Sequence, residues 1–124
     1  MTLSKGVAMT ANTASVGGGT VSSWEISPSL PTGLALDGTT GSISGTPTVL
    51  QTTAFAYTVW ANNSGGSSSA SVNITINDVA PSSLSYSTEN MTLTKGVAMS
   101  ANTASASGGA VTSWEIYPTL PSGL

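Results

Sequence analysis

Few side chains in this sequence could carry out chemistry, and most of those are carboxylates. The chain contains no His and no Cys, so it cannot form a Ser-His-Asp triad or a thiolate metal site. A glycosidase-like carboxylate pair would need two acids on either side of a cleft, and nothing in the sequence predicts a cleft. We therefore expect a non-catalytic protein. The acidic residues are Glu25, Asp37, Asp78, Glu89 and Glu115.

Calcium is the ion that these acids are best suited to bind. The stretch Asn77-Asp78-Val79-Ala80-Pro81 resembles the linker between cadherin repeats, where acids from neighbouring repeats meet on an ion. Calcium takes about 6–8 oxygen ligands, several of them carboxylates, and Asp78 is the one acid in its stretch. The sequence makes Asp78 the first candidate ligand, with Glu25 or Glu115 as partners, and suggests no other cofactor. Asp37 is expected to cap its own turn instead.

Trp60 is the candidate for contact with a ligand or a partner surface. It lies opposite in phase to Tyr57 and Val59 in an alternating segment, so it faces outward if those two residues face the core. An outward Trp can stack on a sugar ring, which would make the protein a glycan binder. The alternative is a Trp half-covered by a neighbouring strand or packed at a contact between repeats.

Charge and hydropathy exclude two classes of partner. The chain has two basic residues and a net charge of −3, whereas nucleic-acid binding needs clustered Lys or Arg. A basic membrane-surface segment is excluded for the same reason. No apolar run approaches the roughly 18 residues of a membrane-spanning helix, so we expect no membrane insertion.

A repeat organises the whole chain. Residues 1–34 recur with mostly conservative changes as residues 91–124, at a constant offset of 90. A fixed period of this kind is typical of tandem arrays. We expect one Ig-like repeat at 1–80 that lacks its first strand, and the truncated first half of the next repeat at 81–124. Because Met1 aligns with Met91, we also expect the chain to be a segment of a longer secreted protein.

The pattern along the chain predicts short strands and no helix. Phe55, Tyr57 and Val59 alternate with smaller or polar residues, and 72–76 alternates in the same way, with the turn signal Asn62-Asn63-Ser64-Gly65-Gly66 between them. This predicts a β-hairpin. Met9 and Met99 are expected to fill the core, and Trp24 to anchor it. Further short strands are predicted at 7–10, 20–27, around Leu34 and Leu36, around Ile43, and around Leu84 and Tyr86.

Three motifs together resemble a known family. They are Trp24-Glu25-Ile26, Leu30-Pro31-Thr32-Gly33-Leu34-Ala35-Leu36-Asp37 and Thr40-Gly41-Ser42-Ile43-Ser44-Gly45-Thr46-Pro47. They are similar to the bacterial putative Ig domain, the cadherin-like or dystroglycan-like repeat of large surface proteins. The resemblance implies an all-β, Ig-like β-sandwich in a tandem array of an adhesin or another extracellular protein. It implies no enzymatic activity and identifies no ligand.

The incomplete second copy has three alternative fates. Residues 82–90 could fold back and supply the missing first strand of 1–80. Residues 81–124 could instead displace 1–34 and pair with 35–80, in the same molecule or a neighbouring one. The tail could also dock on the next molecule and build a head-to-tail fibre, because open strand edges recruit other chains.

The sequence thus predicts an extracellular or cell-surface structural module. Its expected role is a spacer or stalk, or a subunit of a strand-complemented fibre, and its expected partners are other copies of the same repeat. The competing hypothesis is an adhesin module that binds a ligand, with a glycan at Trp60 or calcium at Asp78.

Overall fold

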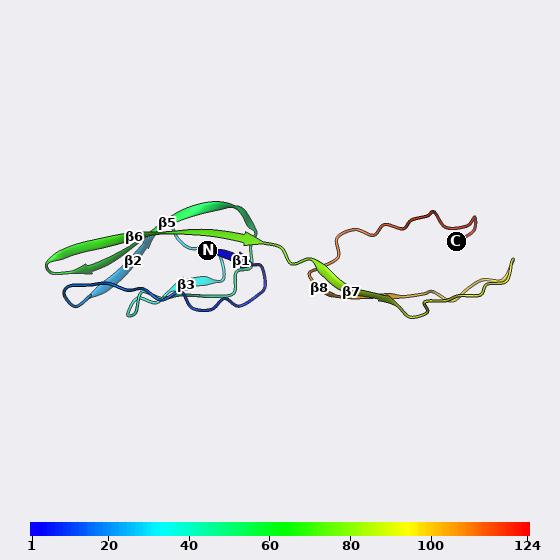
Figure 1. Cartoon of the computed structure of the whole chain (residues 1–124), viewed down its shortest axis with the longest axis horizontal. Coiled ribbons are helices and arrows are strands. Elements are labelled where there is room, and N and C mark those ends of the chain that lie inside the picture. Colours follow the sequence, from blue (N-terminus) through cyan, green and yellow to red (C-terminus); the bar gives the residue numbers. More distant parts are fainter. The chain divides into compact units, whose positions relative to one another are not determined.

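The computed structural model describes residues 1–124 and consists of β-strands, turns and irregular segments. The chain divides into two compact units, unit 1 at Met1–Asp78 and unit 2 at Val79–Leu124 (Figure 1). It contains no helix long and apolar enough to cross a membrane.

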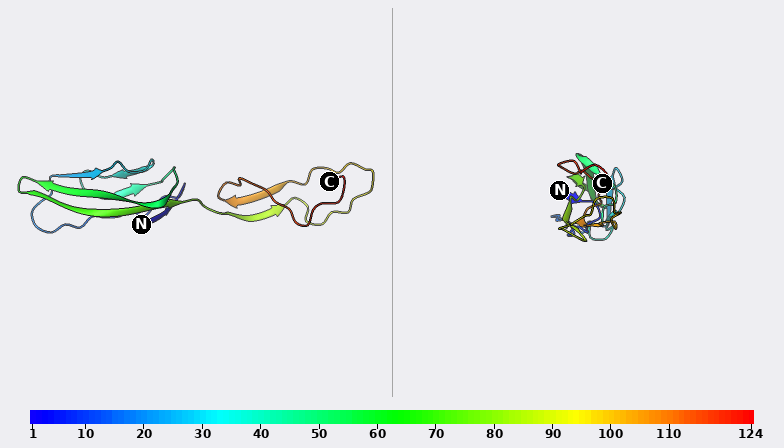
Figure 2. Two further views of the ribbon diagram at one scale, coloured as in Figure 1. Left: turned by 90° about the horizontal axis from the view of Figure 1, so that it is seen from above. Right: turned by 90° about the vertical axis from the view of Figure 1, so that its right-hand side faces the viewer.

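The larger sheet of unit 1 is built around a long hairpin. Its strand order is β1 (Thr2–Ser4), β6 (Gly66–Asn77), β5 (Gln51–Asn63) and β2 (Ser23–Ser27). β5 and β6 pair antiparallel up to Asn63 and Gly66, and they are the two long green strands of Figure 2. The alternating pattern and the Asn-Asn-Ser-Gly-Gly turn therefore predicted this hairpin correctly.

A second, smaller layer faces this sheet. It contains β3 (Leu34–Leu36) and β4 (Ile43–Gly45), which pair antiparallel. Residues 9–12 extend it along β4: Met9 N–H donates to Gly45 O at 3.0 Å, and Asn12 and Ile43 exchange two backbone bonds of 2.8 and 3.0 Å. The strand predicted at 7–10 is wrong, because Val7 lies in a turn with its N–H on Ser4 O, and Gly6 takes a φ of 75°.

The core lies between these two layers. Leu34 packs with Tyr57, Ile74 and Ile76 in one buried cluster, against which Met9 also packs. The Tyr57 hydroxyl donates to Gln51 Oε1 at 2.9 Å, and Gln51 Nε2 donates to Ile74 O at 2.8 Å. The buried Tyr57 hydroxyl and the Gln51 side chain that accepts from it therefore both have hydrogen-bond partners, as buried polar groups generally do.

Two features at the ends of the large sheet differ from the sequence prediction. Phe55 is 51% exposed although it pairs with the fully buried Ile74 in unbroken register; burial along β5 begins only at Tyr57. β1 was not predicted at all. It pairs parallel with β6, with Thr2 opposite Thr75, and the amino group of Met1 donates to Asn73 O at 2.6 Å.

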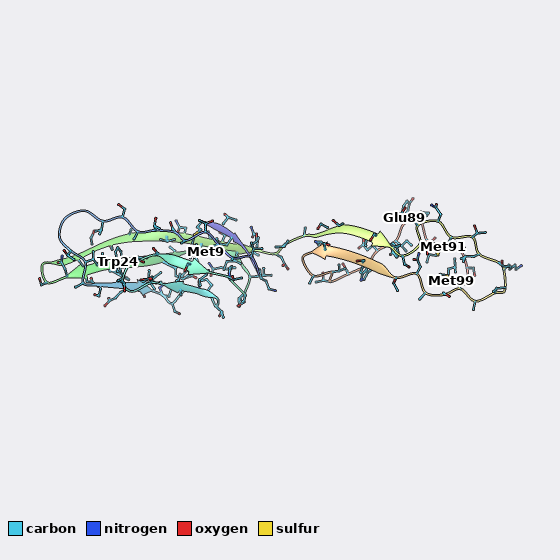
Figure 3. All side chains as sticks on the ribbon, turned by 90° about the horizontal axis from the view of Figure 1, so that it is seen from below. Met9, Trp24, Glu89, Met91 and Met99 are labelled. Carbon is cyan, nitrogen blue, oxygen red and sulfur yellow. The ribbon has the colours of Figure 1, made fainter.

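Unit 2 contains one strand pair and no buried core. β7 (Pro81–Tyr86) runs antiparallel to β8 (Ala104–Gly108), and every residue of both strands is exposed. Met99 is exposed although its counterpart Met9 packs in unit 1 (Figure 3). The prediction that Met99 fills a core is therefore wrong, since unit 2 lacks counterparts of the hairpin that covers Met9.

Candidate functional site

The carboxylates do not gather at one place. No group of three or more acidic side chains is close enough to hold a metal ion. In the large sheet Glu25 of β2 pairs with Trp60 of β5, and Trp60 in turn pairs with Ser69 of β6. Asp78 follows the far end of the same strand β6, and the eight residue steps from Ser69 to Asn77 correspond to roughly 26 Å. Glu25 is therefore not brought to Asp78 within unit 1.

The predicted calcium site at Asp78 consequently does not include Glu25 of the same unit. Asp78 has interactions of its own in the structure, and Glu115 belongs to the other unit. A calcium ion needs about 6–8 oxygens. The assignment of Asp78 as a calcium ligand stays a prediction, which thermal unfolding with added calcium or a chelator tests directly.

Asp37 organises a turn, as its sequence context predicted. Its Oδ1 accepts hydrogen bonds from the backbone N–H groups of Thr39 and Thr40, both at 2.8 Å. Its own N–H donates to Ser42 O, and its carbonyl accepts from Gly41 N–H. The bond from Thr40 N–H, followed by that from Thr39, lowers the pKa of the Asp37 carboxyl below its ordinary value of 3.8, because N–H donors favour the charged form.

This turn gives unit 1 a testable pH dependence. Since the pKa is lower in the folded state, the ionised carboxylate stabilises the fold above about pH 4, and that contribution disappears as the pH falls through the folded-state pKa. Asp37→Asn keeps an oxygen acceptor but loses the charge. We expect Asp37→Asn to be less stable than the parent at pH 7 and equally stable near about pH 2, measured by urea unfolding at both values. Asp37→Ala, which also loses the acceptor, should be less stable at both; identical pH profiles for the parent and Asp37→Asn would contradict the assignment.

Trp60 lies on the face of β5 opposite the core. Its sequence neighbours Val59 and Ala61 are buried, whereas Trp60 itself is half-buried. Exposed Glu25 and Ser69 flank it from β2 and β6. The indole thus lies between two polar side chains on the outer surface of the sheet. Contact between Trp60 and a ligand stays a prediction.

An open cavity of about 430 Å³ enters unit 1 beside residues 12–17. Trp24 forms part of its wall and is half-buried rather than fully enclosed; Figure 3 labels it within unit 1. The ring lies on Gly41, where a Cβ would stand 2.5 Å from the indole. Sequence reasoning did not identify this cavity. Its wall combines residues 12–17 with residues of β2, β4, β5 and β6, so no local sequence signal could have found it.

The comparisons agree with this architecture. The family model described as Putative Ig domain matches residues 2–77, more than half of the 124-residue chain, and comparison with curated proteins gives no match. The matched segment covers both layers of unit 1 and ends with β6. The expected Ig-like β-sandwich is confirmed, and the chain belongs to the Putative Ig domain family.

Proposed function

We propose that this chain is a non-catalytic structural repeat of an extracellular protein and acts as a spacer or stalk in a tandem array. Domains of this family are typically non-catalytic and commonly belong to surface proteins. The observation that carries the proposal is the repeat itself: the family match ends at residue 77, and the next copy begins with β7 at Pro81. Short linkers between self-contained repeats are typical of arrays whose stability is local.

The two layers of unit 1 support this role. Its core is supplied by residues between Leu34 and Ile76 of the same repeat, so each complete copy brings its own hydrophobic core. Its largest sheet is built on strands of 12 and 13 residues, which give each copy a length of about 40 Å along the hairpin. A module of this kind adds length with each copy and needs no ligand.

Arrays of increasing length test the proposal. Proteins with one, two, three and four consecutive copies of residues 1–90 would be compared by small-angle X-ray scattering. We expect the maximum dimension to rise by a constant increment of about 40 Å per copy, with a nearly constant melting temperature beyond the second copy. A maximum dimension that stops growing after the second copy would refute the spacer role.

A ligand-binding adhesin is the second candidate, and the half-buried Trp60 on the outer face of the sheet is the observation that favours it. An aromatic ring between polar side chains suits stacking on a sugar. Binding of the full chain to a glycan array, lost in Trp60→Ala but kept in Trp114→Ala, would support this role. Absence of binding at all sugars would leave the spacer as the function.

A further inference from the structure

The outer face of the large sheet carries a regular patch of side chains around Trp60. The registers of β2 with β5 and of β5 with β6 are unbroken from Thr58 to Asn62, and residues that pair across antiparallel strands project from the same face. Val59 and Ala61 are buried, so the alternate residues of the three strands share the opposite, outer face. They form three rows, which together are called the Trp60 patch: Ser23, Asn62 and Ser67; Glu25, Trp60 and Ser69; Ser27, Thr58 and Ser71.

The chemistry of the Trp60 patch suits an uncharged sugar. The indole stands at the centre, and every residue around it carries a hydroxyl, amide or carboxylate group. An aromatic ring stacks on the C–H face of a sugar, while the surrounding polar groups exchange hydrogen bonds with its hydroxyls. Glu25 is the only charged residue of the patch, and the chain as a whole has a net charge of −3. Anionic ligands are therefore repelled, and the complementary ligand is a neutral glycan.

The shape of the Trp60 patch favours a chain of sugars over a single one. Trp60 lines neither the cavity of about 430 Å³ nor a second cavity of about 410 Å³, so its ring lies on open surface. Sites for one small molecule enclose most of that molecule, whereas an open sheet contacts one side only. The patch extends about 10 Å across its strands and about 14 Å along β5, which is longer than one sugar ring. Such a surface binds well only when the contact is repeated along the ligand.

We propose that the Trp60 patch binds an extended, uncharged, β-linked polysaccharide of the cellulose type. One sugar ring stacks on Trp60, and the neighbouring rings bond to the Ser, Thr and Asn side chains around it. Equatorial linkages keep successive rings in one flat ribbon, which matches a flat sheet face, whereas chains of the starch type coil away from it. The inference rests on the second candidate function and names its class of ligand. It is compatible with the spacer role, because the patch lies on the face of β5 opposite the core.

The repeat itself supplies a variant that enlarges the stacking surface. Tyr117 occupies the repeat position of Ser27 and is 96% exposed, so this position accepts a ring on the surface. Ser27 pairs with Thr58, which places it diagonal to Trp60, at about 7–8 Å and within reach of an aromatic side chain. A Tyr at position 27 would therefore lie beside the indole and contact the next sugar of a bound chain.

Affinity electrophoresis of the full chain in gels that contain hydroxyethylcellulose tests the proposal. This polymer is a soluble, uncharged β-linked glucan, and the retardation of the protein with rising polymer concentration gives the affinity. We expect the parent to be retarded, Trp60→Ala to bind about tenfold or more weakly, and Ser27→Tyr to bind several-fold more tightly. Two controls should migrate like the parent: Trp114→Ala, which removes an indole that is 57% exposed outside the patch, and Thr39→Tyr, which adds a ring between β3 and β4. No retardation of the parent, or a loss in Trp114→Ala equal to that in Trp60→Ala, would overturn the proposal.

A gain of binding separates a role in recognition from a role in folding. Trp60 is half-buried, so Trp60→Ala is checked for folding by urea unfolding, and Trp60→Phe, which keeps a smaller ring, should bind with intermediate affinity. Ser27→Tyr changes an exposed residue, and tighter binding cannot result from unfolding. If Trp60→Ala fails to fold, the comparison of Ser27→Tyr with Thr39→Tyr decides. Tighter binding in Ser27→Tyr alone supports the proposal, and no gain, or the same gain in both, overturns it.

Two further polymers test the class of ligand. Soluble starch is uncharged but α-linked, and dextran sulfate is anionic, so both should retard the parent less than hydroxyethylcellulose does. Equal or stronger retardation by either polymer would overturn the proposal. Binding of single sugars at Trp60 on a glycan array, without retardation by hydroxyethylcellulose, would leave the adhesin function in place and remove this inference alone. Scattering from the arrays of increasing length decides the spacer function separately.

Discussion

Gly33→Ala is expected to destabilise unit 1 by about 4 kcal/mol, which is enough to unfold a small domain. Gly33 has a φ of 94°, and a Cβ there would stand 1.9 Å from Thr46 O and 3.2 Å from Pro47 Cα. The positive φ alone costs an L-residue about 1–2 kcal/mol. The larger part comes from the clash, because the atom in the way is backbone and Thr46 N–H is itself bonded to Gly33 O at 2.9 Å.

The repeat provides a matched control for this prediction. Gly123 is the same repeat position in unit 2 and has a similar φ of 99°, but nothing lies within 4 Å of where its Cβ would stand. Gly123→Ala therefore carries the conformational cost without the clash. Urea unfolding followed by circular dichroism should show a large loss of stability for Gly33→Ala and little change in unit 1 for Gly123→Ala. Equal effects of the two substitutions would show that the close approach to Thr46 is not important.

The parts of the fold that the sequence predicted well are those with local causes. The β5–β6 hairpin follows from two alternating segments joined by an Asn- and Gly-rich turn, and the Asp37 turn follows from side-chain acceptors two and three residues from their donors. Both depend on interactions between near neighbours. β1 had no such signal: three residues that pair parallel with the distant β6 are specified by tertiary packing alone.

Exposure of apolar residues in unit 2 marks a second limit of sequence reasoning. Trp114 and Ile116 carry the same local pattern as Trp24 and Ile26 but are 57% and 61% exposed. In unit 1 the strand that carries the equivalent residues pairs with β5, and Ile26 packs against the core cluster. Burial therefore depends on whether the covering strands are present, and identical local sequence cannot report that.

The candidate sites also divide into features that have local causes and features that depend on tertiary structure. The outward phase of Trp60 could be derived from alternation with Tyr57 and Val59 alone. The separation of Glu25 from Asp78 could not, because it depends on the length and register of β5 and β6. The cavity beside residues 12–17 arises from five segments that are separate in sequence.

The second large effect is expected for Ile74→Ala, at about 2–5 kcal/mol of lost stability. Ile74 is fully buried and packs with Leu34, Tyr57 and Ile76. It lies on β6, which pairs with both β1 and β5, so the side chains that could relax into the space are held by strands on either side. The removed methyl groups therefore leave a cavity that the surroundings cannot easily fill. The measurement is the free energy of unfolding in urea.

Two further variants distinguish the stabilisation from packing in the core from the effect of shortening an apolar side chain at any position. Ile74→Val removes one methyl group and should cost about 0.5–1.5 kcal/mol. Val49→Ala shortens a side chain that is 54% exposed and should change stability by less than about 0.5 kcal/mol. An effect of Ile74→Ala as small as that of Val49→Ala would contradict a core-stabilised unit and leave the backbone ladder as its main support. The graded series would instead show that each complete repeat is stabilised by its own core, which a spacer built from independent copies requires.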